Sequence, residues 1–202
     1  MAKEQRTRAQ HYVPQFILRG FTNNKKKMFC YDKASDRIYP TCPADAAQET
    51  DFYECPPGTT KGPMEVNAVE NQLGKLESAY KPIIERLIKA ADAGKIDPDL
   101  LDHFSPFVAI QWMRTKTYRE TAYETIMKAG QTLVDDLTRV NFPDVVGKLR
   151  FSVGKEGMSA FHAEHMLNPD TILRMARDLD RHIWAIGINK TDRLFGSGLV
   201  QC

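Results

Sequence analysis

The sequence predicts an α+β protein, in which a small mixed or antiparallel sheet from the N- and C-terminal parts packs on a central bundle of α-helices. Short runs of alternating apolar and polar residues near both ends predict strands, and apolar residues at helical spacing dominate the middle. The chain has 202 residues, 42% of them hydrophobic, which is enough to bury one core. We therefore expect a single domain over residues 1–202.

The first 55 residues predict an arm and a strand region. We expect residues 1–10 to form a basic flexible arm and residues 11–55 to form a short motif helix followed by a β-hairpin. The alternating runs 28–33 and 37–39 flank Ala34-Ser35-Asp36, a short polar turn. A loop rich in Pro, Gly and Thr at 56–63 then separates the strands from a helical region.

Residues 64–140 form this predicted helical region. An apolar stripe at helical spacing runs through Val69, Leu73, Leu76, Tyr80, Ile83 and Leu87, although Pro82 should bend this helix or begin a second one. Asp97-Pro98 and Ser105-Pro106 both predict helix starts. The second should open a long helix toward Val140, with Gly130 as the place where it could divide.

Residues 149–200 predict a strand, a helix and a second strand. The strand at 149–153 should end in a turn at 154–157, and Asn168-Pro169-Asp170 should cap the next helix. The apolar run 183–188 predicts a buried strand near the end of the chain.

Composition limits the class of protein. No apolar run reaches the roughly 20 residues of a membrane span, and the polar start lacks the apolar centre of a secretory signal, so we expect a cytoplasmic protein with no membrane partner. Four scattered cysteines, without a Cys-x-x-Cys pair, predict reduced thiols rather than a disulfide scaffold.

The net charge of +2 is unevenly distributed. Residues 1–27 carry seven Lys or Arg against one Glu, whereas residues 28–102 carry eight against fourteen acidic residues. Lys3, Arg6, Arg8 and the run Lys25-Lys26-Lys27 could contact the phosphates of a nucleic acid or nucleotide in a salt-sensitive manner. The alternative is a solvated terminus and a solvated turn.

His11 is the first candidate for chemistry. It lies in His11-Tyr12-Val13-Pro14-Gln15, before a rigid proline and an apolar run that ends near Arg19. An imidazole titrates near neutral pH and can transfer a proton or bind a metal. The alternative is a structural histidine that caps the following helix.

Gln111 and Arg114 are the most informative polar pair, because they share a predicted helix face with Phe104, Phe107 and Val108. Burying a guanidinium without a partner costs several kcal/mol. Arg114 therefore either meets an internal carboxylate or lines a pocket for a ligand phosphate or carboxylate. Candidate partners are Asp51, Glu70 and Glu77.

Glu70 and Glu77 are seven residues apart and project from nearly the same helix face, where two carboxylates could bind a divalent cation. The alternative for Glu77 is a chain of ion pairs that includes Lys81 and Glu85. His162 and His165 could also form a ligand pair, but their spacing is not that of zinc proteases, and the alternative is two solvated side chains on the surface.

Motifs for nucleotide-dependent kinases, dinucleotide-binding dehydrogenases and α/β-hydrolases are missing from the sequence. Five ordered motifs instead resemble the bacterial family known as domain of unknown function 4238. They are His11-Tyr-Val-Pro-Gln-Phe-x-Leu-Arg19, Phe29-Cys-Tyr-Asp-Lys33, Asp51-Phe-Tyr53, Val69-Glu70-x-x-Leu73-x-x-Leu76-Glu77 and Gln111-x-x-Arg114-Thr115, followed by Trp184 and Asn189-Lys190-Thr191. The family name implies no activity.

The resemblance has one departure. Similar proteins follow the Trp strand with Phe-x-x-Ser-Asp-x-Pro, whereas this chain has Phe195-Gly-Ser-Gly-Leu-Val200. The missing aspartate implies a truncated or diverged member. If that aspartate belongs to a catalytic set, the protein would bind without turnover.

Two functions are supported as hypotheses. The first is a phosphodiesterase or nuclease-like enzyme acting on nucleic acid or a nucleotide, in a phage or defence context. Its catalytic residues would be His11, Glu70, Glu77 and Arg114, and its substrate-binding residues would be Arg19, Gln111, Tyr12 and Tyr53. A divalent metal such as Mg or Mn would be bound by Asp51, Glu70 and Glu77. The second is a non-catalytic regulator or inhibitor that binds a partner, nucleic acid or protein, and in which the polar cluster is structural.

Overall fold

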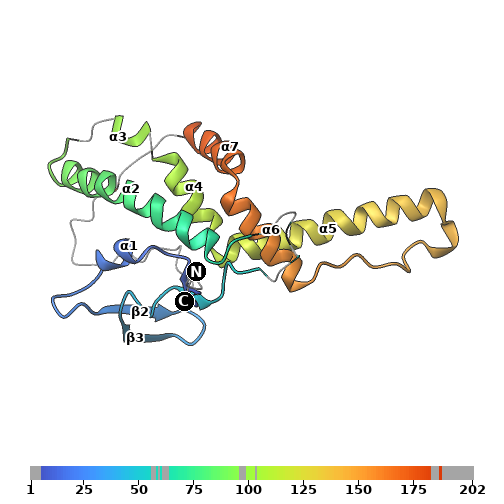
Figure 1. Ribbon diagram of the computed structural model, residues 1–202, viewed down its shortest axis with the longest axis horizontal. Coiled ribbons are helices and arrows are strands. Elements are labelled where there is room, and N and C mark those ends of the chain that lie inside the picture. The colour runs from blue at the N-terminus through green and yellow to red at the C-terminus, as the bar shows by residue number, and fades with distance from the viewer. Residues whose placement is uncertain are drawn as a thin grey trace, which may run out of the picture.

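The fold is α+β, with a small strand layer on one side of a group of helices from which one long helix projects (Figure 1). The computed structural model describes residues 6–55, 58, 60, 64–95, 99–102, 104–182 and 187. Its elements are β1 (Ala9–His11), α1 (Gln15–Arg19), β2 (Met28–Asp32), β3 (Arg37–Thr41), β4 (Gln48–Thr50), α2 (Ala68–Asp92), α3 (Asp99–Asp102), α4 (Ser105–Met113), α5 (Lys116–Asn141), the 3-10 helix η1 (Pro143–Val145), α6 (Lys155–Leu167) and α7 (Pro169–Asp180).

The strands form two antiparallel pairs, β1 with β4 and β2 with β3. The second pair is the predicted hairpin, in which Asp32 accepts hydrogen bonds from Ala34 and Ser35 and so orders the turn. All strands within the described residues come from positions 9–50, so the expected contribution of 149–153 is wrong. Leu149–Val153 is irregular, and the predicted strand 183–188 lies outside the described residues, apart from Gly187.

Three predictions about helix boundaries also differ from the structure. No second helix begins at Pro82, because buried residues on both sides of it, such as Leu73 and Leu87, stabilise one continuous helix α2. The long helix predicted from Ser105 divides at Arg114 rather than at Gly130, because the side chain of Thr115 accepts a hydrogen bond from the Tyr118 amide and begins α5. The predicted turn at 154–157 is instead the start of α6.

The core lies where the N-terminal segment meets the helices. One cluster of buried apolar residues joins Tyr12, Leu18 and the 52–53 pair to side chains of α2, α4 and α6. Asn168 caps α7 as predicted, since its side chain accepts hydrogen bonds from the amides of Asp170 and Thr171. No helix in the described part of the chain is long and apolar enough to span a membrane.

The outer part of α5 and the segment after it form an arm that projects from the molecule (Figure 1). Residues 142–154, here called the return segment, run back along α5. Gln131 holds them there by donating to the Leu149 carbonyl and accepting from the Phe151 amide. The Phe151 ring packs on Gly130, where an added methyl group would lie 2.3 Å from a ring carbon.

Two helical glycines therefore should respond differently to the same change. Gly74→Ala, on α2, meets nothing within 4 Å and should raise the free energy of unfolding by about 1 kcal/mol through helix propensity. Gly130→Ala should not raise the free energy of unfolding in this way, because the added methyl group displaces the Phe151 ring. Hydrogen exchange should then be faster at 149–153 only in the Gly130 variant. Equal stabilisation with unchanged exchange would contradict the packing described here.

Candidate functional site

Arg114 is the centre of the candidate site. It is the first residue after α4, and only 2% of its side chain is exposed. Its Nη1 donates to Glu77 Oε1 on α2 at 2.9 Å, and its Nη2 donates to the backbone carbonyl of His11. Of the three candidate partners, Glu77 thus carries the ion pair. The guanidinium connects two helices to the N-terminal segment.

Tyr53 completes this connection. Its hydroxyl lies 3.3 Å from the Arg114 carbonyl oxygen and 3.4 Å from that of His11, and either oxygen can accept its proton. Burial raises the pKa of Tyr53 to about 12, so the hydroxyl stays protonated and remains a donor. The cluster of His11 carbonyl, Tyr53, Glu77 and Arg114, here called the arginine cluster, is largely closed on itself.

Glu70 lies two helical turns before Glu77 on α2 and belongs to the same electrostatic environment. Burial raises its pKa to about 7, with Glu77 and Glu54 adding repulsion and Arg114 opposing the shift. Its Oε1 is buried and has no hydrogen-bond partner among the described residues, and the same is true of Arg114 Nε. Each atom could therefore form a hydrogen bond with a water molecule or a ligand.

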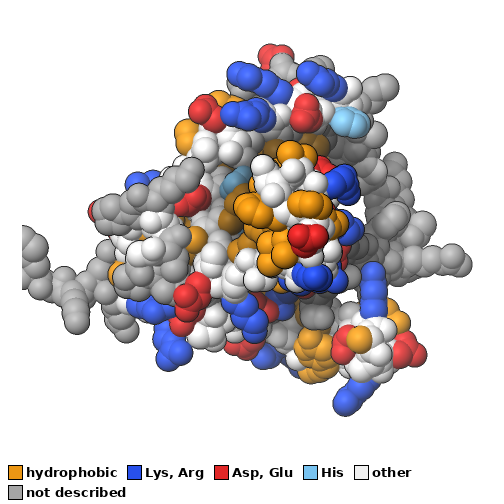
Figure 2. Space-filling model, turned by 90° about the vertical axis from the view of Figure 1, so that its right-hand side faces the viewer, with side chains coloured by type: hydrophobic (Ala, Val, Ile, Leu, Met, Phe, Trp, Pro, Cys, Tyr) orange, Lys and Arg blue, Asp and Glu red, His pale blue; other side chains and the backbone are white. Residues whose placement is uncertain are grey.

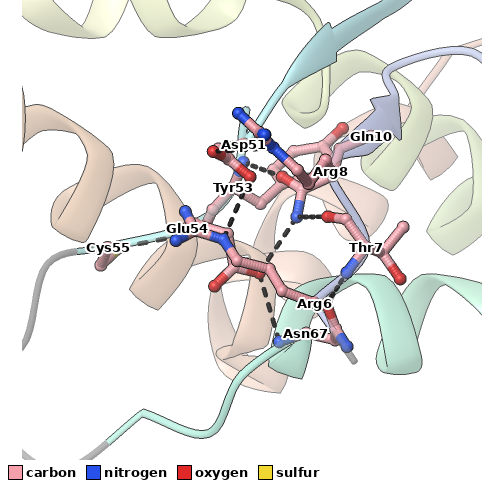
Figure 3. Close-up of polar contacts among 9 residues, drawn as sticks. All are labelled: Arg6, Thr7, Arg8, Gln10, Asp51, Tyr53, Glu54, Cys55 and Asn67. Atoms are coloured by element: carbon pink, nitrogen blue, oxygen red, sulfur yellow. Dashed lines mark hydrogen bonds and ion pairs between the residues drawn. The ribbon is translucent and has the colours of Figure 1, made fainter. Parts of the chain in front are cut away.

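A second polar network holds the N-terminal strand against α2 (Figure 3). The buried Gln10 side chain donates to Glu54 and to the Thr7 carbonyl, and accepts from the Tyr53 amide. Glu54 also accepts from the backbone amide of Asn67, just before α2. Gln10, Glu54 and Asn67 carry no sequence motif that would have identified them.

Arg6 and Arg8 belong to the same region. Arg6 Nε lies 3.0 Å from Asp51 Oδ1, and Arg8 Nε lies 4.0 Å from Asp51 Oδ2 (Figure 3). Asp51 therefore pairs with the start of the chain and not with Arg114. Part of the basic arm is thus held near Asp51, although the Arg8 side chain remains 75% exposed.

His162 forms a third network, and its interpretation as a solvated surface residue is wrong. It is buried on α6, and its Nε2 lies 2.7 Å from the Met113 carbonyl while its Nδ1 accepts from Arg119. The proton must be on Nε2, since a carbonyl oxygen only accepts. Burial and Arg119 lower the pKa of His162 to about 4, so the ring is neutral and structural.

The remaining predicted site residues do not converge on the arginine cluster. The His11 imidazole lies 3.0 Å from the Ala44 carbonyl, and Arg114 contacts the backbone of His11 rather than its ring. Arg19 is exposed and donates to Gln15 on α1. Tyr12 is buried against Phe52 in the core. Gln111 is half-buried on α4.

The predicted metal site has no geometric support. Within the described parts of the chain, no group of three or more His, Cys, Asp or Glu side chains could hold a metal ion. Glu70 and Glu77 share a helix face as predicted, but Glu77 is bound by Arg114 and Asp51 by Arg6. Metal binding by these residues stays a prediction.

Comparison with known proteins gives one match. Residues 9–196 match the family model described as Protein of unknown function (DUF4238), which covers most of the chain. The chain belongs to this family, as the five motifs indicate. No curated protein and no solved structure matches it significantly.

If Glu77 neutralises Arg114, their ion pair should contribute strongly to the free energy of unfolding. Glu77→Ala leaves a buried guanidinium without its carboxylate and should lower the free energy of unfolding by about 3 kcal/mol in urea denaturation. The matched control is Glu85→Ala on the same helix, where the exposed pair with Lys81 should change it by less than about 1 kcal/mol. Equal losses in the two variants would argue against a buried ion pair.

Proposed function

We propose that this protein binds single-stranded nucleic acid, without cleaving it, through the outer face of the β2–β3 hairpin. That face consists of Phe29, Tyr31, Ile38 and Pro40, here called the hairpin face. Phe29 pairs with Pro40 and Tyr31 with Ile38, so all four side chains project on the same side. Phe29 is 65% and Tyr31 51% exposed, and this exposed aromatic pair is the observation that carries the proposal.

The spacing of the two rings suits stacked bases. Phe29 and Tyr31 are two residues apart on one strand, which separates them by about 6.8 Å along it. The Tyr31 hydroxyl donates to Asp36 at 2.7 Å, which fixes the ring from the turn. Proteins that bind single strands without sequence preference use aromatic side chains in this way, because every base has a π-face.

Basic residues flank the hairpin face at both ends. From Arg19 to Pro40 there are six Lys or Arg and two Asp, a balance of +4 in a chain whose total is +2. Lys25, Lys26 and Lys27 lie in a turn that Asn23 orders through hydrogen bonds to two of their amides. Lys33 and Arg37 lie at the opposite end. Aromatic rings between two cationic clusters are typical of surfaces that follow a phosphate backbone.

The arginine cluster supports binding rather than catalysis. A catalytic arginine needs donors directed at a ligand, whereas both Nη atoms of Arg114 are used by Glu77 and by the His11 backbone. We further propose a regulatory or inhibitory role in the cytoplasm of a bacterium or its phage. Reduced thiols there agree with the free cysteines Cys42 and Cys55.

Replacing Phe29 by Ala should weaken binding of a fluorescent single-stranded oligonucleotide by about 5- to 150-fold, because stacking contributes about 1–3 kcal/mol per base. Fluorescence anisotropy at fixed salt measures the change. Trp112→Ala is the matched control, since Trp112 is 50% exposed but lies on α4, away from the hairpin. Unaltered affinity in Phe29→Ala, or an equal loss of affinity in the control variant, would refute binding through the hairpin face.

A specific observation also favours the enzymatic alternative, a phosphodiesterase or nuclease-like activity. Glu70 combines a buried oxygen without a partner in the described structure and a pKa of about 7, on which the Arg114 guanidinium acts electrostatically. Such a carboxyl is suited to proton transfer near neutral pH, and the guanidinium could stabilise phosphate charge. Under this alternative, His11 and a divalent cation assist as the sequence predicts.

This alternative predicts hydrolysis of a model phosphodiester in the presence of Mg²⁺ or Mn²⁺. As a general base, Glu70 acts in its ionised form, so the rate should rise as the pH increases through about 7. Glu70→Gln and His11→Ala should both abolish the activity while circular dichroism stays unchanged. No turnover by the wild-type protein, with either metal across this range, would leave only the binding function.

A further inference from the structure

The arm carries an apolar stripe most of which the described chain leaves exposed. The stripe consists of Ile126, Ala129, Leu133, Leu137 and Val140, here called the arm stripe. At 3.6 residues per turn these side chains fall within an arc of about 80°. Leu133 is 60%, Leu137 54% and Val140 81% exposed. Their spacing of three and four residues averages 3.5, as in helices that pair side by side.

The return segment does not cover the arm stripe. It packs on a different side of α5, where Gly130 meets Phe151 and where the Thr138 side chain is buried. Figure 2 views the molecule from the end of the arm and shows hydrophobic side chains gathered at that end, with acidic and basic side chains beside them. An exposed apolar stripe of this length marks an interaction surface.

The order of residues in the stripe identifies the partner. Counted from Leu133, its members lie at −7, −4, 0, +4 and +7, so the stripe is the same in either direction. We propose that it binds the same stripe of a second copy of this chain, antiparallel, with a two-fold axis at Leu133. Leu133 then faces its own equivalent, Ala129 faces Leu137, and Ile126 faces Val140. A two-fold interface requires this self-complementarity.

Charged residues stay off the stripe. Around α5, Asp136 lies about 60°, Arg139 about 120° and Lys128 about 140° from the centre of the stripe, and Glu124 lies on the opposite side of the helix. The stripe itself therefore carries no charge that pairing would have to bury.

The ends of the arms fit this arrangement. Antiparallel pairing brings Asn141 of one copy opposite Thr125 of the other, nine residues beyond the start of α5, so each tip stops short of the other molecule's body.

The test is sedimentation equilibrium of three proteins over a wide concentration range. The wild type should dimerise. Leu133→Glu should raise the dimer dissociation constant more than about hundredfold, because it places two carboxylates together at the two-fold axis. Leu173→Glu, an equivalent change at an exposed leucine on α7, should leave it unchanged. Circular dichroism should show that all three are folded, since both leucines are exposed.

A mixing experiment then distinguishes this interface from any other. Leu133→Glu and Leu133→Lys copies should each be monomeric alone and should form a mixed dimer together, because opposite charges meet at the axis. A copy with Ile126→Cys should cross-link to one with Val140→Cys more readily than either does with itself. A monomeric wild type, a dimer that Leu133→Glu leaves intact, or no recovery on mixing would overturn the proposal.

Discussion

The buried guanidinium of Arg114 is the constraint on which the rest of the structure depends. A charge with 2% exposure must be compensated inside the protein, and its partners come from three distant segments: Glu77 on α2, the His11 carbonyl in the N-terminal segment, and Tyr53 after β4. Each Nη atom of Arg114 thus fixes one segment at a defined place. Because His11 takes part through its backbone, the N-terminal segment must run past the end of α4, which in turn fixes β1 and the pairing of β1 with β4.

This explains how polar residues of catalytic types are accommodated in an apolar setting within the described structure. Buried polar groups satisfy one another, as Gln10, Glu54 and Asn67 do in the second network and Arg119, His162 and Met113 do in the third. Three buried atoms have no hydrogen-bond partner within the described residues: Glu70 Oε1, Arg114 Nε and Asp51 Oδ1, the last of which is ion-paired with Arg6. Chemistry at this centre would have to involve the first two.

Local signals in the sequence were sufficient for the local structure. The β2–β3 hairpin, the amphipathic face of α2 and the Asn168 cap were predictable, because alternation, helical spacing and capping depend on neighbours in sequence. The partner of Arg114 could be narrowed to three carboxylates but not chosen, since the choice depends on packing. The break after α4 was not predicted, because glycine is the usual sign of a helix break and the sequence has Gly130 further along. Gly130 instead allows the Phe151 ring to pack closely on α5. His162 was missed because nothing near it in sequence indicates burial.

The two exposed surfaces lie at opposite ends of the molecule, the hairpin below the helices and the arm at the far side (Figure 1). With the arms paired about Leu133, the two α5 helices begin on opposite sides of the two-fold axis. Their first residues, the two copies of Lys116, then lie about 50 Å apart along the helix axes. Two hairpin faces would then be held in one rigid assembly. A single strand long enough to reach both would bind the second face at a high effective concentration, so that modest stacking at each hairpin becomes tight binding overall. The closed polar core gives the rigidity that such a spacing requires.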